Sequence, residues 1–344
     1  MRNRLSNFTA LFVLALTATV LMQNCKKPPP EKFELKIPLG LDAEAQYIPE
    51  NNPLTAEKVE LGRKLYFDKR LSADNSVSCA TCHSPKFGFT DGSPVSTGIN
   101  GQKGGRSAPT VVNRLFSKEQ FWDGRAEDLE AQALGPVENP IEMGNTLEAC
   151  VKKLNAIEGY RKEFQKVFGT EVTADGIAKA IASFERTVIS GNSPFDRFKA
   201  GEENALSESA RRGLELFEGK ANCVTCHVGF NFTDEGYRNI GVGMDKEAPD
   251  SGRFDVTKEE TDRGAFKTPT LREIASTAPY MHDGSERTLL DVINFYDKGG
   301  ITNPYLSTDI KPLKLTDEEK ADLVAFMESL TGEMGEFEEP TLPE

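Results

Sequence analysis

The sequence predicts a mostly α-helical protein built from two tandem domains of the same plan. A Cys-x-x-Cys-His motif occurs twice, at 79–83 and at 223–227, so the copies lie 144 residues apart. Each copy follows a segment with the periodicity of an amphipathic helix, and each repeat closes with another such segment. A repeat of this length can bury a core of its own, which favours two domains over one.

A predicted helix precedes each motif and starts at a hydroxyl side chain. The first helix begins after Thr55 and the second after Ser207. A hydroxyl at the N-cap accepts a hydrogen bond from a free backbone N–H of the first helical turn. Similar segments rich in Phe and Asp then follow the motifs, at 87–92 and at 230–236. The repeat therefore extends on both sides of each motif.

The closing helices are predicted at 174–189 and 316–330. Apolar residues recur at helical spacing in the first, and the second opens with Thr316 and Glu319 in the pattern of a capping box. Turn-forming residues at 190–194 follow the first closing helix and mark a boundary. We therefore expect an N-terminal domain over 51–190, a C-terminal domain over 191–335 and a tail over 336–344.

The chain starts with the pattern of a bacterial export signal. Arg2 and Arg4 precede an apolar run over 8–22, which is too short for a comfortable membrane span. We expect residues 1–24 to be a signal peptide and the protein to be periplasmic. Cys25 follows the apolar run, as in lipid-anchored proteins, although bulkier and more polar residues precede it than the usual small pair.

Two alternatives stay open at Cys25. Either it carries a lipid that attaches the protein to the membrane, or the signal is uncleaved or cleaved elsewhere and Cys25 is free or paired. Residues 25–50, rich in Pro and charge, are expected to form a tether to the folded part.

Charge and cysteine usage exclude several classes of protein. The formal net charge is −13, which opposes binding to nucleic acid and attraction to anionic lipid. Four of the six cysteines belong to the two motifs, which leaves Cys25 and Cys150. A disulfide framework is therefore not the design, and Cys150 is expected to be a buried apolar residue.

The two motifs have the signature of covalent c-type haem attachment. Two thiols one helical turn apart can form thioether bonds to the porphyrin, and the adjacent imidazole can bind the iron. A zinc knuckle or a thioredoxin-like pair would explain one Cys-x-x-Cys, but neither needs a His after both copies. The prediction is two cytochrome c-like domains, each holding one haem through its motif: Cys79, Cys82 and His83, and Cys223, Cys226 and His227.

Five further segments resemble the bacterial di-haem cytochrome c peroxidase family, which includes the MauG branch. They occur in the family's order between about residues 50 and 332, so the resemblance covers nearly the whole mature chain. The segments are 108–113, 121–125, 135–143, 267–272 and 279–284. The resemblance implies an enzyme that reduces hydrogen peroxide.

The resemblance also implies roles at the first haem. His83 matches the proximal ligand of the haem that meets peroxide, whose other face is open. Glu142 matches the catalytic acid that moves a proton between the two peroxide oxygens. Gln132 matches an amide that orients peroxide. Read alone, Glu142 and Gln132 would be solvated surface side chains, because lone polar residues usually are.

The second haem and the space between the haems receive roles in the same way. Trp122, the only tryptophan, matches a residue between the haems that could carry an electron, and a packing role is also expected. His227 matches the proximal ligand of the electron-transfer haem. Tyr296, fourteen residues after His282, stands where many relatives have a Met ligand, as in the MauG branch. A phenolate ligand would stabilise the higher oxidation states of iron.

Alternatives to Tyr296 as the sixth ligand are Met281, Met244, His282 or water. His282 itself is expected to form a hydrogen bond or to pack on the haem. Ile99 stands where other members carry a His that blocks the resting peroxide site. We therefore expect the first haem to be high-spin and reactive without prior reduction.

The family also places a calcium ion between the domains. Thr277 and Pro279 fall at its carbonyl ligands, and Ser107 stands in place of an Asn. A hydroxyl is a weaker calcium donor than an amide oxygen, so calcium is a candidate cofactor only. The family commonly dimerises, so a homodimer is also a candidate.

These observations lead to one prediction and two alternatives. The prediction is a peroxidase that reduces hydrogen peroxide to water with electrons from a small c-type cytochrome or cupredoxin. The first alternative is a MauG-like oxidase that modifies a protein or small molecule through a bis-Fe(IV) state. The second is a non-catalytic di-haem electron carrier or sensor.

Overall fold

The computed structural model describes residues 33–344. The predicted signal peptide at 1–24, Cys25 and the first part of the predicted tether lie outside the described residues. Within 33–344, no helix combines the length and the apolar character needed to cross a membrane.

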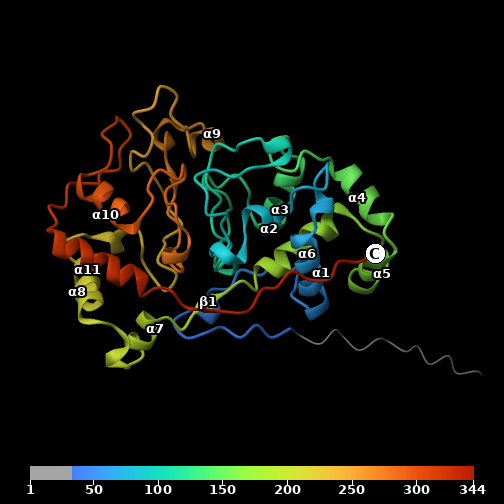
Figure 1. Ribbon diagram of the computed structural model, residues 1–344, viewed down its shortest axis with the longest axis horizontal. Helices are drawn as coiled ribbons and strands as arrows, with labels where there is room; N and C mark the ends of the chain where they lie inside the picture. Colours follow the sequence, from blue (N-terminus) through green and yellow to red (C-terminus); the bar gives the residue numbers. More distant parts are fainter. Residues whose placement is uncertain (1–32) are drawn as a thin grey trace, which may run out of the picture. The chain divides into compact units, whose positions relative to one another are not determined.

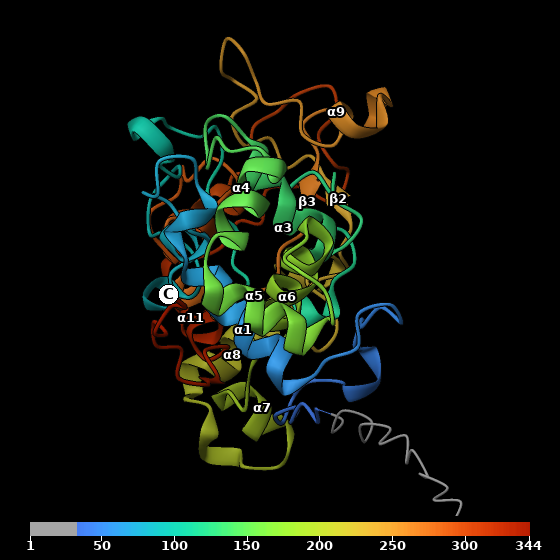
Figure 2. The ribbon, with the colours of Figure 1, turned by 90° about the vertical axis from the view of Figure 1, so that its right-hand side faces the viewer.

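The first domain is a set of helices packed around the first motif (Figures 1 and 2). Thr55 caps the first helix by accepting a hydrogen bond from the backbone N–H of Lys58, as predicted. The α-helices of this domain are α1 (Ala56–Phe67), α2 (Cys79–Cys82), α3 (Leu129–Glu138), α4 (Leu147–Asn155), α5 (Glu158–Val167) and α6 (Ala174–Glu185).

Helices α1 and α6 pack directly on each other and lie side by side in Figure 2. Gly62 of α1 makes the close approach possible, because a Cβ there would lie 1.8 Å from the Ala180 carbonyl oxygen. Predicted to reach residue 189, α6 ends instead at Glu185. The β-branched Thr187, Val188 and Ile189 that follow favour extended backbone and lead into a strand. The core of this domain includes Leu61, Leu65, Tyr66, Phe89, Phe164 and Phe184.

The second domain repeats this plan. Ser207 caps α8 through the backbone N–H of Ala210, and Thr316 and Glu319 form the predicted capping box of α11. Gly213 allows α8 to approach α11 about as closely as Gly62 allows α1 to approach α6. A Cβ at Gly213 would lie 2.0 Å from the Asp322 carbonyl oxygen of α11. The α-helices are α7 (Pro194–Lys199), α8 (Glu208–Glu218), α9 (Phe254–Thr257), α10 (Leu289–Asp297) and α11 (Asp317–Glu328). Its core includes Phe217, Phe232, Leu323 and Phe326.

Two small antiparallel sheets accompany the helices in the described part of the chain. Strand β1 (Ser190–Gly191) pairs with β4 (Glu333–Met334), and β2 (Tyr237–Arg238) pairs with β3 (Phe266–Lys267). Short 3₁₀ turns join these elements: η1 (Ala43–Ala45), η2 (Lys69–Leu71), η3 (Pro85–Phe87), η4 (Ile99–Gly101), η5 (Arg114–Phe116), η6 (Glu203–Ala205), η7 (Cys223–Thr225), η8 (Glu260–Asp262) and η9 (Ile274–Ser276). The prediction of a mostly α-helical, two-domain protein is confirmed.

The segment after α11 runs back across the first domain (Figure 1). Phe337 packs on Phe89 and Phe184, with ring centroids 5.1 and 5.9 Å away. Near the end of the chain, the Arg70 guanidinium donates to the Pro343 carbonyl oxygen at 3.0 Å. The predicted tail at 336–344 therefore covers part of the first domain's core.

Candidate haem sites

The first motif lies on the short helix α2, with both thiols partly buried. The backbone N–H of His83 donates to the Cys79 carbonyl oxygen at 2.9 Å, which closes the turn and brings the three side chains together. Burial raises the pKa of the Cys82 thiol to about 11, and it raises that of Cys79 further. Both groups are therefore neutral thiols before any covalent attachment.

His83 is held in the orientation that a proximal ligand requires. Its Nδ1 lies 3.0 Å from the Pro109 carbonyl oxygen and 3.4 Å from that of Phe89. A carbonyl only accepts, so Nδ1 carries the proton and Nε2 keeps a lone pair for a metal. Burial also lowers the pKa of His83, which favours the neutral, ligating form.

The second motif has the same arrangement on η7. His227 places its Nδ1 3.0 Å from the Phe232 carbonyl oxygen, and burial lowers the pKa of His227. Burial raises the pKa of Cys223 to about 12 and also raises that of Cys226. Two domains thus present the same donor set, two thiols and one neutral imidazole, which fits covalent c-type haem in each.

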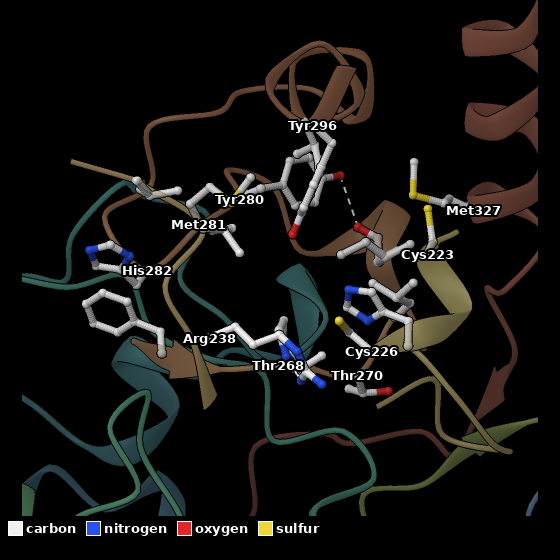
Figure 3. Close-up of a pocket in the computed structure, with 18 of the residues that line it drawn as sticks. Cys223, Cys226, Arg238, Thr268, Thr270, Tyr280, Met281, His282, Tyr296 and Met327 are labelled. Carbon is white, nitrogen blue, oxygen red and sulfur yellow. Dashed lines mark hydrogen bonds between the residues drawn. The ribbon is translucent and has the colours of Figure 1, made fainter. Parts of the chain in front are cut away.

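A cavity in the second domain opens beside this motif and is lined by both thiols, His227 and Tyr296. Figure 3 shows Tyr296 reaching from α10 into the cavity across from Cys226. Burial raises the pKa of Tyr296 well above its ordinary value, and negative charge on the two thiols would raise it further. Because the phenol is neutral by itself, a bound cation would be needed to ionise it at ordinary pH.

The alternative ligands lie in different places. Met281 and His282 line the same cavity as Tyr296, whereas Met244 is not among its lining residues. His282 is buried and stacks on Phe266, with ring centroids 3.6 Å apart and planes 13° apart. Burial lowers the pKa of His282 to about 4, so its imidazole is neutral and packed.

Trp122 connects the two domains at this cavity. Its Nε1 donates to the Ser107 carbonyl oxygen at 2.9 Å, and its own carbonyl oxygen accepts from the Lys267 backbone N–H at 2.7 Å. The backbone N–H of Ser107 in turn donates to the His282 carbonyl oxygen at 2.7 Å. Trp122 belongs to a loop of the first domain but lines the cavity of the second.

Glu142 lies close to the first motif, because its charge acts on the pKa of both thiols there. Its Oε1 accepts a hydrogen bond from Asn139 Nδ2 at 2.7 Å. The residue is half-buried, and burial raises the pKa of the Glu142 carboxyl group despite the nearby Arg125 guanidinium. Gln132 is half-buried on α3, the helix that precedes this loop.

Ile99 lies directly beside Glu142. The Ile99 backbone N–H donates to the Glu142 carbonyl oxygen at 2.9 Å, and the Ile99 side chain is buried in the core of the first domain. An apolar side chain without a metal-binding atom therefore occupies this position.

Arg125 is a site residue that the sequence analysis missed. Its guanidinium lies 3.5 Å from the ring centroid of Phe121 and forms an ion pair of 3.0 Å with Asp123. From there it acts on the pKa of Glu142, which it lowers. The segment 121–125, which resembles the family, already contains this arginine. That the Arg125 guanidinium acts on Glu142 could not be predicted, because it depends on tertiary packing.

The three candidate calcium ligands line one cavity near the boundary between the domains. Ser107, Thr277 and Pro279 all line the cavity of the second domain, and a Cβ at Gly88 of the first domain would lie 2.9 Å from the Thr277 methyl group. The Ser107 carbonyl oxygen is already used by Trp122. Among the described residues, no cluster of three His, Cys, Asp or Glu side chains could hold a metal.

Comparison with known proteins agrees with this geometry. The family model described as di-haem cytochrome c peroxidase matches residues 56–204, and the cytochrome c model matches residues 210–331. The methylamine utilization protein MauG of Methylorubrum extorquens is 42% identical over 86% of this chain and 84% of its own length. Cytochrome c551 peroxidase of Nitrosomonas europaea is 41% identical over 85% of each chain.

A solved structure also resembles the chain. The crystal structure of a MauG-like protein associated with microbial copper homeostasis has a TM-score of 0.80 and 34% identity, over 88% of this chain and 96% of that one. The family models and these relatives together support an oxidoreductase with two c-type haems. With its two haem motifs, its repeated helix crossing and these relatives, the chain belongs to the di-haem cytochrome c peroxidase family that includes MauG.

Proposed function

We propose that the protein reduces hydrogen peroxide to water at the first domain, with electrons from a small c-type cytochrome or cupredoxin that enter through the second. The observation that carries this proposal is the pairing of Glu142 with Ile99 beside the first motif. A half-buried carboxyl group can move protons there, and the neighbouring side chain offers no atom to block an iron ligand position.

The haem, when bound, supplies an iron that binds peroxide and exchanges electrons. Glu142 accepts a proton from one peroxide oxygen and returns it to the other, which then leaves as water. Asn139 donates to one carboxylate oxygen and fixes the orientation of Glu142. Gln132 is assigned to orient the peroxide, because it lies on the helix that leads into the Glu142 loop. Two electrons and two protons complete the conversion of peroxide to two water molecules.

We assign Tyr296 as the sixth ligand of the second haem. Its support is the position of the phenol in the cavity that holds Cys223, Cys226 and His227. Trp122 is assigned to carry electrons between the domains, since it belongs to one domain and lines the cavity of the other. A tyrosine ligand would stabilise the higher oxidation states of the second haem, which suits it to hold an oxidising equivalent until the donor supplies an electron.

Steady-state assay of the holoprotein with peroxide and a reduced small cytochrome tests the main proposal. Oxidation of the cytochrome that requires peroxide is expected. Its absence with several cytochromes and cupredoxins would favour the carrier or sensor function instead.

A second candidate function is a MauG-like oxidase. Its support is the 42% identity to a MauG protein together with Tyr296 in the second cavity. The lifetime of the peroxide-oxidised protein separates the two functions. Decay within seconds favours the peroxidase, and persistence for many minutes favours an oxidase that waits for a partner protein or small molecule.

Calcium, membrane attachment and dimerisation are separate proposals. The support for calcium is that Ser107, Thr277 and Pro279 all line the same cavity. Elemental analysis before and after a chelator tests it. Export to the periplasm and a lipid at Cys25 rest on the sequence pattern, and a Cys25→Ser variant that stays in the membrane fraction would exclude the lipid. Sedimentation of the holoprotein tests the homodimer.

A further inference from the structure

Glu185, the last residue of α6, is a buried carboxyl group that the proposed peroxide chemistry does not use. Only 4% of the residue is exposed, and its Oε2 has no hydrogen-bond partner among residues 33–344. Ionising an unpaired carboxyl group away from water is costly. Accordingly, burial raises the pKa of Glu185 to about 8.

The two guanidinium groups that act most strongly on Glu185 form hydrogen bonds to other side chains. Arg186 forms two hydrogen bonds to Glu130, of 2.6 and 2.8 Å, and Arg114 donates from Nε to Gln120 Oε1 at 2.8 Å. Both arginines lower the pKa of Glu185, but neither cancels the effect of burial. The Glu185 carboxyl group is thus not half of an ion pair.

The internal repeat shows where this carboxyl group lies. Helix α1 meets α6 at Ala180, and α8 meets α11 at Asp322, each through a glycine. The neighbouring Phe184 and Phe326 also face these two glycines, at 3.0 and 2.8 Å from the position of a Cβ. Ala180 and Asp322 are 142 residues apart, and so are Phe184 and Phe326. The same offset therefore aligns α6 with α11.

The same offset pairs Glu185 with Met327. Met327 lines the cavity of the second domain and lies beside Cys223 in Figure 3. In the first domain, the charge of Glu185 raises the pKa of Cys79, the counterpart of Cys223, and of Tyr66. Glu185 therefore occupies the haem-facing wall of the first domain, where the second domain has a thioether.

The other groups that face Glu185 in the described chain have fixed charges. Burial raises the pKa of Tyr66, whose hydroxyl donates to the His83 carbonyl oxygen at 2.7 Å, so the phenol stays neutral. Cys79 is a neutral thiol, or a thioether once haem is attached. The remaining groups are charged and engaged in polar contacts: Arg114 of η5, Glu130 of α3 and Arg186 after α6.

We propose that Glu185 is a redox-linked proton site for the haem of the first domain. When a one-electron donor reduces ferric iron to ferrous, a Glu185 oxygen takes up one proton from solvent and an O–H bond forms. When the iron gives up the electron, that O–H bond breaks and the proton returns to solvent. This inference deepens the proposed function and rests on it only through the attachment of a haem at Cys79 and Cys82.

The physical reason is reciprocal coupling between two charges in a medium of low dielectric constant. A carboxylate stabilises the more positive ferric haem, so ionisation of Glu185 favours oxidation. By linkage, reduction must strengthen proton binding at Glu185 to the same extent. Electron and proton uptake together keep the net charge of the buried site unchanged, which limits the desolvation cost of reduction.

Potentiometric titration of the holoprotein at several pH values tests this proposal. Between the pKa values of Glu185 in the ferric and ferrous protein, the reduction equilibrium constant of the first haem should fall tenfold per pH unit, about 59 mV for a one-electron couple. The potential falls as pH rises, because the carboxylate form favours ferric iron.

A Glu185→Gln variant keeps the size of the side chain but cannot change charge. It should reduce the pH dependence of the first haem to the part that Glu142 contributes, and leave that of the second haem as in the wild type. The matched control is Glu138→Gln, which removes an exposed carboxyl group on α3 of the same domain. It should keep the wild-type pH dependence at both haems. An undiminished slope at the first haem in Glu185→Gln would overturn the proposal.

Two further tests apply if the Glu185→Gln variant does not fold or does not bind haem. Glu185→Met, which installs the residue of the equivalent position, should reduce the slope to the same extent. Infrared difference spectra of the wild type should show a carboxylic acid C=O band that forms on reduction of the first haem, and its absence contradicts the proposal. Peroxide turnover is measured separately. If the wild type shows the pH dependence at the first haem but no peroxide turnover, the proposed function is refuted and this inference is not.

Discussion

The two haem domains share a helix crossing, a motif and a hydrogen-bonded proximal histidine, but different side chains face their haems. In the first domain, burial raises the pKa of two carboxyl groups near the motif, Glu142 and Glu185. In the second, Tyr296 and Met327 line the cavity. Groups that bind and release protons suit peroxide chemistry, whereas a phenol ligand suits storage of an oxidising equivalent. Under the proposed function, the first domain would handle protons and the second would handle electrons.

The largest expected effect comes from removing the carboxyl group proposed to carry the proton in the first domain. Glu142→Gln should lower kcat for peroxide by about 10²–10⁴-fold, because an amide cannot move the proton between the peroxide oxygens. Glu138→Gln, an exposed carboxyl group nearby, should turn over as the wild type does. Steady-state kinetics with a reduced cytochrome measures both, and equal rates in the two variants would refute the role of Glu142.

The pH dependence of turnover should also depend on Glu142. Glu142 must be ionised to accept the first proton, and burial raises the pKa of its carboxyl group above the ordinary range. Activity should therefore fall as pH decreases through that raised value. A pH profile of kcat/KM measures the acidic limb, which should be absent from the residual activity of Glu142→Gln.

Placing a ligand in the first domain should make it resemble an electron-transfer domain. Ile99→His puts an imidazole beside Glu142, and an imidazole on the iron would exclude peroxide from the fully ferric protein. The rate of reaction with peroxide should fall in proportion to the fraction of blocked sites. Ile99→Leu is the control. Stopped-flow mixing with peroxide measures this rate, and an EPR spectrum of the ferric protein shows whether the imidazole binds the iron. A rate equal to that of the wild type would mean that position 99 does not face the iron.

In the second domain, the corresponding change removes the phenol. Tyr296→Phe should alter the optical and EPR signals of one haem only and raise its potential, because a phenolate favours higher oxidation states. Tyr280→Phe is a matched control from the same cavity, since the Tyr280 hydroxyl donates to the Ile274 carbonyl oxygen. If both variants have wild-type spectra, Tyr296 is not a ligand.

The smallest effects concern the shared plan. Gly62→Ala and Gly213→Ala each force a methyl group against a carbonyl oxygen in the helix crossing, and overpacking of this kind lowers the free energy of unfolding by about 1–3 kcal/mol. Gly135→Ala on α3 has ordinary contacts at 3.5 Å and should stabilise its helix by about 0.5–1 kcal/mol. Denaturant unfolding of the holoprotein compares them, and similar losses at both crossings would support a common architecture.

Local patterns were sufficient to predict most of the fold. The caps at Thr55, Ser207 and Thr316 form as expected, because each hydrogen bond joins residues three apart in the sequence. The two motifs likewise identify their own chemistry. In contrast, the course of the last residues across Phe89 depends on contacts between parts of the chain that are far apart in the sequence. The early end of α6 at Glu185 follows from the β-branched residues at 187–189, which the apolar spacing alone did not take into account.

The candidate site was predictable only in part for the same reason. Glu142 and Tyr296 were found through resemblance to a family, since an isolated Glu or Tyr carries no signal of its own. Arg125 and Glu185 were missed because their importance depends on what faces them across the core. An unpaired carboxyl group in particular cannot be recognised until its neighbours are known.

The proposed mechanism requires the first domain to react with peroxide in its fully ferric state while the second shares the oxidising equivalents. Rapid mixing of fully ferric holoprotein with one equivalent of hydrogen peroxide, followed by EPR and optical spectra, tests it most directly. The high-spin signal and the low-spin signal are expected to disappear together within the mixing time. If neither signal changes until a reductant is added, the first site is blocked at rest and the proposed mechanism is wrong.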